Sequence, residues 1–436
     1  MEMTMEATTM DAPPRLDVDR LLDDPQTRII VCCGAGGVGK TTTAAALGVR
    51  AAERGRKVVV LTIDPARRLA QSMGIDSLDN TPRRVTGVRG PEGADGGGEL
   101  HAMMLDMKRT FDEIVEGHSD PERAEAILAN PFYQSLSAGF AGTQEYMAME
   151  KLGQLRARDD WDLIVVDTPP SRSALDFLDA PGRLGSFLDG KFIRVLMAPA
   201  KVGGRAGMKF LNVGMSMMTG TLSKLMGASL LKDVQTFVAA MDTMFGGFRT
   251  RADATFQLLQ APGTAFLVVS APEPDALREA AYFVERLAAE RMPLAGLVLN
   301  RVHGSGAEQL SAERALAAAE NLEEGGIVDQ ESGKAGLRDS TDPASDSDTD
   351  PDARTARETG ADAVEADVDV ITAGLLRLHA ERMQVIAREQ RTRDRFTSLH
   401  PEVAVAEVAA LPGDVHDLAG LRAIGERLAA GVPAGA

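Results

Sequence analysis

The chain has 436 residues, of which 44% are hydrophobic, and a formal net charge of −17, so it contains enough apolar material for a large buried core. It has no uncharged apolar run of about 18 residues, which excludes a membrane-spanning helix, and its acidic N-terminus lacks the pattern of an export signal. Lys and Arg form no cluster typical of nucleic-acid binding, and the adjacent Cys32 and Cys33 exclude C-x-x-C zinc spacing, so we expect a cytoplasmic protein with buried thiols.

Hydrophobic periodicity predicts alternating strands and helices after a disordered N-terminus of about 15 residues. In chain order the first half contains a strand at 27–33, a helix at 41–54, a strand at 57–63, a helix at 66–73, a Gly- and Pro-rich loop at 81–98, a strand at 99–105, helices over 108–158 with a break near Asn130-Pro131, a strand ending at Asp167 and a short helix at 171–178.

The second half begins with helical periodicity and glycine breaks over 181–260. It continues with a strand at 264–270, a helix at 275–291, a strand at 294–300, a helix at 307–321, a helix at about 371–393, a strand at 403–408 and a helix at 416–430. Strands separated by helices predict an α/β fold, a doubly wound, mostly parallel sheet in three layers. Its ligand site is expected at the carboxyl ends of the strands.

The most specific motif directly follows the first predicted strand. Residues 34–42 read GAGGVGKTT and fit the phosphate-loop pattern G-x-x-x-x-G-K-[ST]. We expect the backbone of this loop to surround the phosphates of ATP, with a helix N-terminus facing them. Lys40 adds a positive charge at the outer phosphates, and the Thr41 hydroxyl ligates Mg²⁺. The predicted nucleotide-binding residues of the loop are Gly34, Ala35, Gly36, Gly37, Val38, Gly39, Lys40, Thr41 and Thr42.

A dinucleotide-binding fold is the alternative, because the glycines also fit G-x-G-x-x-G and Asp64 ends the next strand. Two features decide against it. Lys40 and Thr41 immediately follow the last glycine, and the apolar strand before Thr168 ends in Asp167. An acid at the end of such a strand is typical of the second half of a Mg-nucleotide site. The sequence therefore predicts an ATP site with Asp167 at the metal.

Two segments have unusual compositions. Residues 320–369 hold sixteen acidic and four basic residues and almost no large apolar ones, so we expect a disordered acidic insertion over 321–369. Residues 197–244 hold eight methionines, whose flexible thioethers suit either a surface for varied apolar partners or an ordinary core. We therefore divide the chain into a disordered N-terminus (1–15), a phosphate-loop core in three parts (16–180, 261–320 and 370–436), a Met-rich helical subdomain (181–260) and the acidic insertion (321–369).

Four segments in this order resemble the ArsA family of anion-transporting ATPases: GGVGKTTTAAALG, LTIDPARRLA, DTPPSRSALDFLDAP and AGLVLNRVHG. The resemblance covers about residues 25–320 and 370–430. That family includes the arsenite-pump ATPase and the factor that targets tail-anchored proteins. The resemblance implies a Mg-dependent ATPase, in which the Asp64-Pro65-Ala66 segment is the first switch and Asp64 orients the attacking water. Asp64 and Lys40 are then the catalytic residues, and Thr41, Asp64 and Asp167 lie at the metal.

The resemblance also implies three nucleotide contacts beyond the loop. Asn300 ends a strand where the superfamily places an adenine-contacting asparagine, Pro412 would lie near the base, and Glu273 would touch the nucleotide. Residues 167–176, DTPPSRSALD, match the second switch of the family but depart from its pattern, since Arg172-Ser173 replaces Gly-His.

A further departure is Ala35, which occupies the position of a family lysine that reaches the phosphates of the other subunit. The absence of this lysine implies slow hydrolysis, a substitute cation such as Arg172, or a paralogous partner that supplies the lysine. The alternative is that Ala35 simply fits the loop. We therefore expect either a homodimer or a heterodimer with a paralogous ATPase.

Three functions follow from the resemblance. We favour a nucleotide-switched ATPase that binds and releases a hydrophobic client or membrane protein. An arsenite or anion pump subunit is disfavoured, because soft arsenite needs thiolates and both cysteines lie beside the phosphate loop. A partitioning or septum-positioning ATPase is disfavoured, because residues 416–436 are weakly amphipathic and nearly neutral rather than basic.

Overall fold

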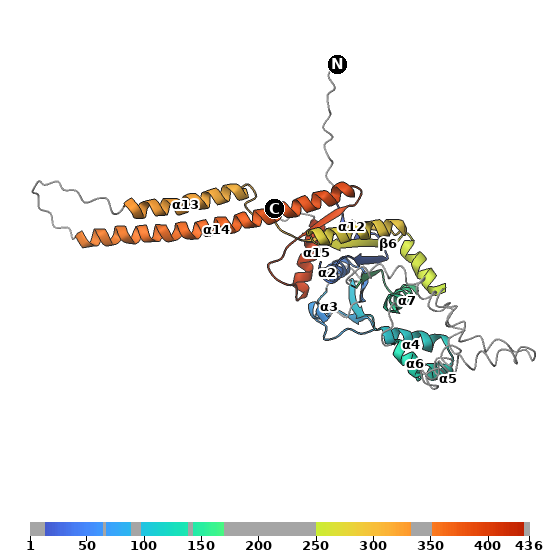
Figure 1. Ribbon diagram of the computed structural model, residues 1–436. Coiled ribbons are helices and arrows are strands. Elements are labelled where there is room, and N and C mark those ends of the chain that lie inside the picture. Colours follow the sequence, from blue (N-terminus) through green and yellow to red (C-terminus); the bar gives the residue numbers. More distant parts are fainter. Residues whose placement is uncertain are drawn as a thin grey trace, which may run out of the picture.

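The computed structural model describes residues 14–63, 67–88, 97–137, 143–169, 250–332 and 351–430 (Figure 1). An eight-stranded sheet lies at their centre, in the order β3-β4-β2-β5-β1-β6-β7-β8. Only β3 is antiparallel to its neighbour, so the predicted doubly wound, mostly parallel sheet is confirmed. The strands are β1 (Ile29–Cys33), β2 (Lys57–Thr62), β3 (Arg83–Arg84), β4 (Glu99–Met104), β5 (Leu163–Asp167), β6 (Thr264–Ser270), β7 (Leu294–Val302) and β8 (Val405–Ala409).

Helices cover both faces of this sheet (Figure 1). In chain order they are α1 (Val18–Asp23), α2 (Lys40–Glu53), α3 (Arg67–Ser72), α4 (Met107–His118), α5 (Pro121–Leu128), α6 (Pro131–Ser137), α7 (Thr143–Ala157), α12 (Pro274–Ala289), α13 (Ala312–Ser332), α14 (Pro351–Leu399) and α15 (Leu418–Ala430). Residues 250–260 are also helical. None of the helices in these ranges is long and apolar enough to cross a membrane.

Two hydrophobic cores lie on opposite faces of the sheet, because successive side chains of a strand point to opposite sides. In β1, Ile29, Val31 and Cys33 face a core that includes residues of α4, α7 and α12. Ile30 and Cys32 face the other core, which includes residues of α2 and α15. The result is a three-layer fold in which the carboxyl ends of the parallel strands share one edge.

Short elements were the hardest to predict. The six-residue α1 and the two-residue β3 have too few residues to show a period, although Val18 and Leu22 of α1 are buried. The predicted break near Asn130-Pro131 is confirmed between α5 and α6. A second break was missed, where Asp120 accepts a hydrogen bond from the backbone of Arg123 and caps α5.

The described parts of the acidic segment 321–369 are helical where we expected disorder, since α13 continues to Ser332 and α14 begins at Pro351. Ala, Glu and Arg have high helix propensity, and a helix satisfies its own backbone hydrogen bonds without burying apolar surface. The two helices also lie side by side as a hairpin that projects from the body (Figure 1). Residues 333–350, the predicted helix at 171–178 and most of the Met-rich segment lie outside the described residues, and the domain boundaries stay a prediction.

Candidate nucleotide site

The phosphate loop joins β1 to α2, and glycine is required at several of its positions. Gly37 and Gly39 have φ angles of 77° and 94°, which L side chains rarely adopt. A Cβ atom at Gly34 would lie 2.0 Å from the carbonyl oxygen of Val269, and one at Gly39 would lie 2.2 Å from Nδ2 of Asn300. The loop therefore folds tightly against β6 and the end of β7, which only glycine permits.

The exposed part of the phosphate loop presents backbone atoms rather than side chains. Ala35 and Val38 are buried in the core cluster that also contains Ala44 of α2, whereas Gly36 and Gly37 are exposed. Gly39 caps α2 without a side-chain hydrogen bond to the first turn. The N-terminus of a helix presents partial positive charge and N–H donors, so this arrangement suits an anion such as a phosphate.

Lys40 lies inside this loop. Only 6% of the residue is exposed, and its Nζ donates a hydrogen bond to the carbonyl oxygen of Ala35 at 2.7 Å. An ammonium group buried this deeply costs free energy unless nearby acceptors or anions compensate it. The phosphates of a nucleotide would supply that compensation, so the position of Lys40 fits its predicted role.

Thr41 and Asp167, predicted from separate motifs to share the metal, are in contact. The Thr41 hydroxyl donates to Oδ2 of Asp167 at 2.7 Å, and Asp167 is fully buried at the end of β5. The Thr62 hydroxyl donates to the same oxygen at 3.0 Å from the neighbouring strand. Thr62 was missed in the sequence, since a threonine at the end of a strand carries no distinguishing signal.

Hydroxyl and carboxylate oxygens are the ligands that Mg²⁺ prefers, together with phosphate oxygens and water. Thr41 and Asp167 therefore fit a Mg-nucleotide, with most of the remaining ligands coming from the nucleotide and solvent. No group of three or more His, Cys, Asp or Glu side chains in the described ranges forms a metal site by itself.

Asp64, together with Pro65 and Ala66, lies outside the described residues. The chain just before it is held at the site: the backbone N–H of Ile63 donates to the carbonyl of Asp167 at 3.0 Å. The carbonyl of Ile63 in turn accepts a hydrogen bond from Nε2 of Gln144 at 3.0 Å. Gln144 lies in the first turn of α7, so this helix contacts the residue that precedes the first switch.

Asn300 lies at the phosphate loop. Its Nδ2 donates to the carbonyl of Val38 at 2.8 Å, and the residue is 7% exposed. Glu273 is the exposed N-cap of α12, and Pro412 is exposed beyond β8. Both follow the carboxyl end of a strand, on the same edge as the loop. Contact of Asn300, Glu273 and Pro412 with the nucleotide stays a prediction, as does that of the partly exposed Thr42.

The two thiols are unsuited to binding a soft ion together. Burial raises the pKa of the Cys33 thiol to about 12, and burial together with the nearby Asp167 carboxylate raises the pKa of Cys32 well above its usual value. The side chains also face opposite cores of the sheet. Neither thiolate nor a shared ligand position is therefore available at neutral pH.

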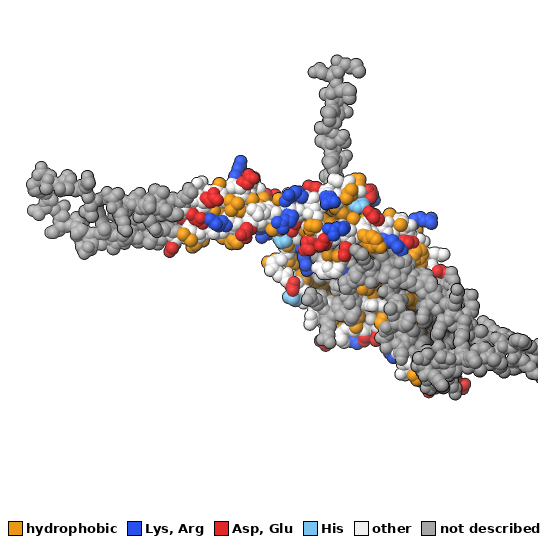
Figure 2. Space-filling view, viewed as in Figure 1, with side chains coloured by type: hydrophobic (Ala, Val, Ile, Leu, Met, Phe, Trp, Pro, Cys, Tyr) orange, Lys and Arg blue, Asp and Glu red, His pale blue; other side chains and the backbone are white. Residues whose placement is uncertain are grey.

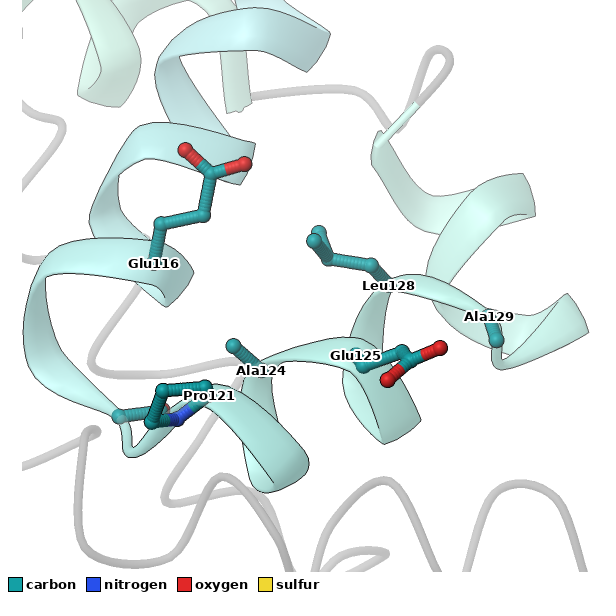
Figure 3. A pocket seen from close by; sticks show the side chains of 7 residues that line it. Glu116, Pro121, Ala124, Glu125, Leu128 and Ala129 are labelled. Carbon is teal, nitrogen blue, oxygen red and sulfur yellow. The ribbon is translucent and has the colours of Figure 1, made fainter.

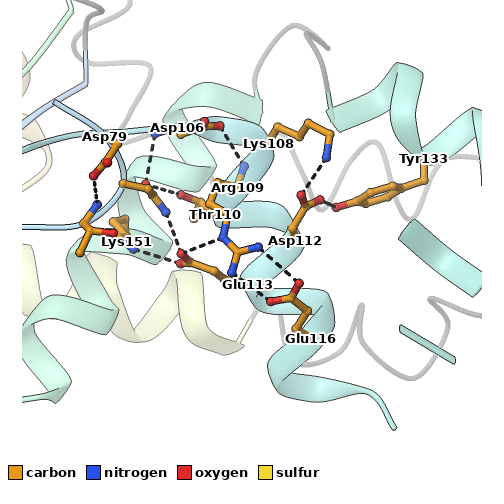
Figure 4. A network of polar contacts seen from close by, with 12 residues as sticks. Asp79, Asp106, Lys108, Arg109, Thr110, Asp112, Glu113, Glu116, Tyr133 and Lys151 are labelled. Atoms are coloured by element: carbon orange, nitrogen blue, oxygen red, sulfur yellow. Dashed lines mark hydrogen bonds and ion pairs between the residues drawn. The ribbon is translucent and has the colours of Figure 1, made fainter. Parts of the chain in front are cut away.

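A polar network joins α7 to α4 (Figure 4). Glu113 of α4 accepts hydrogen bonds from Nζ of Lys151 at 3.0 Å and from Nδ2 of Asn80 at 3.1 Å. Oδ1 of Asn80 accepts from the backbone of Asp106 at 3.1 Å and from the hydroxyl of Thr110 at 3.0 Å. Sequence reasoning missed this network, because its members are scattered over about seventy residues without a motif.

A second buried contact joins α7 to the helix at 250–260. Glu150 is 5% exposed, and its Oε1 accepts a hydrogen bond from Nε of Arg251 at 2.8 Å. Tyr146 donates to the other oxygen of Glu150 at 3.1 Å. The helix α7 thus contacts three parts of the molecule: the chain just after β2, the helix α4 and the helix at 250–260.

An open cavity of about 560 Å³ lies between α4 and α5 (Figure 3). Apolar side chains such as Ala124 and Leu128 line it beside the carboxylates of Glu116 and Glu125. Ser119, Pro121 and Ala129 complete the lining. The cavity is separate from the phosphate loop and belongs to the helices that α7 supports.

Comparison with known proteins identifies one family. The family model described as anion-transporting ATPase matches residues 27–324. An ATPase GET3 of Podospora anserina is 26% identical over 303 residues, which cover 68% of this chain and 80% of the relative. An ATPase GET3 of Malassezia globosa is 29% identical over 177 residues, covering 41% of this chain and only 49% of the relative. A putative arsenical pump-driving ATPase of Halobacterium salinarum is 29% identical over 211 residues, which cover 45% of this chain and 31% of the relative.

Proposed function

Because this chain belongs to the anion-transporting ATPase family, whose members hydrolyse ATP, we propose that it is a nucleotide-switched ATPase that binds and releases a hydrophobic client. One observation carries the proposal. The Thr41 hydroxyl at the start of α2 meets the buried Asp167 carboxylate at the end of β5, at 2.7 Å. This pairing joins the two halves of a Mg-nucleotide site at the edge of the sheet where such ligands bind.

Each residue of the site has a role in binding ATP. The loop backbone holds the phosphates, and Lys40 replaces its contact with the Ala35 carbonyl by one with the outer phosphate oxygens. Bound Mg²⁺ would supply positive charge at those oxygens, held through Thr41 and Asp167. Asp64, one residue beyond the anchored Ile63, would orient the water that attacks the terminal phosphate.

The helix α7 supports a route from this site to the helices that would hold a client. Gln144 contacts the carbonyl of Ile63, next to the first switch, at 3.0 Å. Lys151 of the same helix holds Glu113 of α4, and Glu150 holds Arg251 beyond the Met-rich segment. A displacement of the switch backbone on ATP hydrolysis would therefore reach α4 and the helix at 250–260 through one packed element.

Two features support a hydrophobic client. The cavity between α4 and α5 is lined mainly by apolar atoms of Ala124, Leu128 and Pro121. The segment 197–244, outside the described residues, holds eight methionines, which adapt to apolar surfaces of varied shape. We also propose that the chain works as a dimer whose two nucleotide edges face each other, because Ala35 occupies the position of a family lysine that reaches the phosphates of the other subunit.

An arsenical pump role is the second candidate, because one relative has that name. The chemistry of the described site opposes it. Arsenite binding needs thiolates, whereas the pKa of Cys33 is raised to about 12 and the two cysteines face opposite cores.

The test measures capture of a model client in different nucleotide states. The full chain, with ATP and Mg²⁺, is titrated with a fluorescent peptide containing a single apolar helix of about 20 residues, the length of a membrane span. We expect the peptide to bind in a nucleotide-dependent manner, and a scrambled charged peptide of equal length to bind in neither state. Peptide binding that is equal with ATP, with ADP and without nucleotide would contradict the proposed coupling.

A further inference from the structure

The hairpin of α13 and α14 projects beyond the edge of the sheet at which the nucleotide site lies. The body holds α14 at its C-terminal part: Nε of Arg382 donates to the carbonyl of Gly304, just past β7, at 2.6 Å, and Arg393 pairs with Glu407 of β8 at 2.7 Å. Because α14 runs back along the sheet from this point, everything before Arg382 lies outside the carboxyl edge. We call α13 and residues 351–381 of α14 the arm; at 1.5 Å per residue, its α14 part is roughly 45 Å long.

One side of the arm is occupied by the hairpin itself. Ala373 and Ala380 of α14 are buried, as are Ala315 and Ala319 of α13, so the two helices pack closely. Arg377 of α14 pairs with Glu323 of α13 at 2.6 Å. This face of α14 therefore has its partner within the chain.

The opposite side of α14 carries an exposed apolar stripe. Its members recur at intervals of three and four residues, with Arg382 at the one charged position: Val368, Ile371, Leu375, Leu378 and Val385. Ile371, Leu375 and Leu378 are each 62–63% exposed. Such heptad spacing is the pattern of a coiled-coil seam, which buries its apolar residues against another helix. Figure 2 shows hydrophobic side chains among charged ones along this part of the molecule.

We propose that this stripe pairs with the same stripe of a second copy of the chain, in an antiparallel coiled coil. The inference rests on the proposed function, in which two subunits face each other across their nucleotide edges. An arm that leaves this edge extends toward the other subunit. Two such arms, each extending toward the other subunit, are related by a twofold axis perpendicular to them, so they run antiparallel and present the same surface to each other. The stripe and the phosphate loop then contribute to one continuous dimer interface.

The charges along the arm favour this antiparallel arrangement. The outer part of α14 is acidic, since residues 351–369 hold six acidic and two basic residues. The inner part is basic, since residues 370–395 hold six arginines and three acids. Antiparallel pairing places the acidic outer part of each arm over the basic inner part of the other, whereas parallel pairing would place like charges together.

Cysteine cross-linking tests the pairing directly. The native Cys32 and Cys33 are buried, so a new surface cysteine is the reactive one. Leu375→Cys, in the middle of the stripe, is compared with Val370→Cys, which is 68% exposed but off the stripe. Under mild oxidation we expect roughly tenfold more disulfide-linked dimer from Leu375→Cys, because a disulfide needs closely apposed Cα atoms. Equal yields from both variants would overturn the proposal.

A second experiment separates this inference from the proposed function. The double variant Leu375→Glu, Leu378→Glu leaves the nucleotide site unchanged, and Val370→Glu serves as its control. We expect sedimentation to show dimerisation weakened by roughly tenfold or more in the double variant only, while ATP binding by each chain stays within about twofold of the wild type. A double variant that dimerises as tightly as the wild type would refute the arm pairing, and so would a wild-type chain that stays monomeric at micromolar concentration. Absence of ATP binding in the wild type would instead refute the proposed function.

Discussion

Nδ2 of Asn300 donates to the carbonyl of Val38 at 2.8 Å, although the two residues are 262 positions apart in the chain. The contact ties the end of β7 to the phosphate loop, and Gly39 provides the space for it. The asparagine thereby stabilises the conformation of the loop, whatever part of the nucleotide it also touches.

Asn300→Ala tests this contact. Loss of the hydrogen bond leaves a buried carbonyl without this donor and should weaken nucleotide binding by about 1–2 kcal/mol, roughly tenfold. If Asn300 acts through the loop, we expect calorimetric titrations to show that the affinities for ATP and for GTP fall by the same factor. A loss confined to ATP would instead identify it as the residue that recognises adenine.

Lys40→Ala should abolish detectable ATP binding, because no other described side chain supplies a positive charge inside the loop. Equilibrium binding of a fluorescent ATP analogue measures the effect. Lys108→Ala, on the exposed surface of α4, is the matched control and should bind normally. Retention of near-normal affinity in Lys40→Ala would show that the loop does not hold the phosphates.

Asp64→Asn should bind ATP with nearly the affinity of the wild type but hydrolyse it at least about a hundredfold more slowly, since it removes water orientation and keeps the phosphate contacts. Single-turnover hydrolysis separates the two effects. If binding and turnover fell together, the residue would be structural rather than catalytic.

We predict that a partner subunit supplies the lysine that Ala35 replaces. The isolated chain should bind ATP but turn it over slowly, and a partner with a lysine at this loop position should raise turnover beyond the sum of the separate rates. Ala35→Lys should raise turnover of the self-associated chain. Because Ala35 is buried beside Val38, the longer side chain should also cost about 1–3 kcal/mol of unfolding free energy, seen as a lower Tm. Rapid hydrolysis by the unmodified monomer would contradict the whole expectation.

The buried thiols predict a pH dependence of stability. The pKa of Cys33 is raised from 9.0 to about 12, so the folded state holds the proton more tightly than the unfolded state. The contribution of this thiol to the free energy of unfolding should therefore be constant below pH 9 and should fall as the pH rises toward 12. Urea unfolding at pH 8 and pH 10.5 measures the change, about 1 kcal/mol or more. A Cys32→Ala, Cys33→Ala variant should lose the part of this dependence that the thiols contribute, whereas the buried Tyr133 and Tyr146, whose pKa values burial also raises, keep their part.

The parts of the site that follow from local rules were predictable from the sequence. Lys40 and Thr41 are fixed by a contiguous motif, and Asp167 by the end of an apolar strand, so their meeting follows from parallel strands that share one edge. Thr62, Gln144 and the Asn300 contact with Val38 depend on which strands and helices become neighbours, and that information lies in packing between distant segments. The helices at the two ends of the acidic segment were not predicted, because its composition indicates poor burial but says little about a helix supported by a hairpin partner.

The arm has a consequence for how this protein tolerates change. β7 and β8 are parallel neighbours, so the chain between them must return across the sheet, and the hairpin occupies that return path without setting the register of either strand. Insertions and deletions at its outer end leave the core untouched. The apolar stripe lies in the inner part of α14, so such changes also leave its spacing intact. The length of the hairpin can therefore change during evolution, whereas the residues of its apolar stripe are constrained. This makes the hairpin a suitable position for inserting reporter sequences or for exchanging dimer specificity.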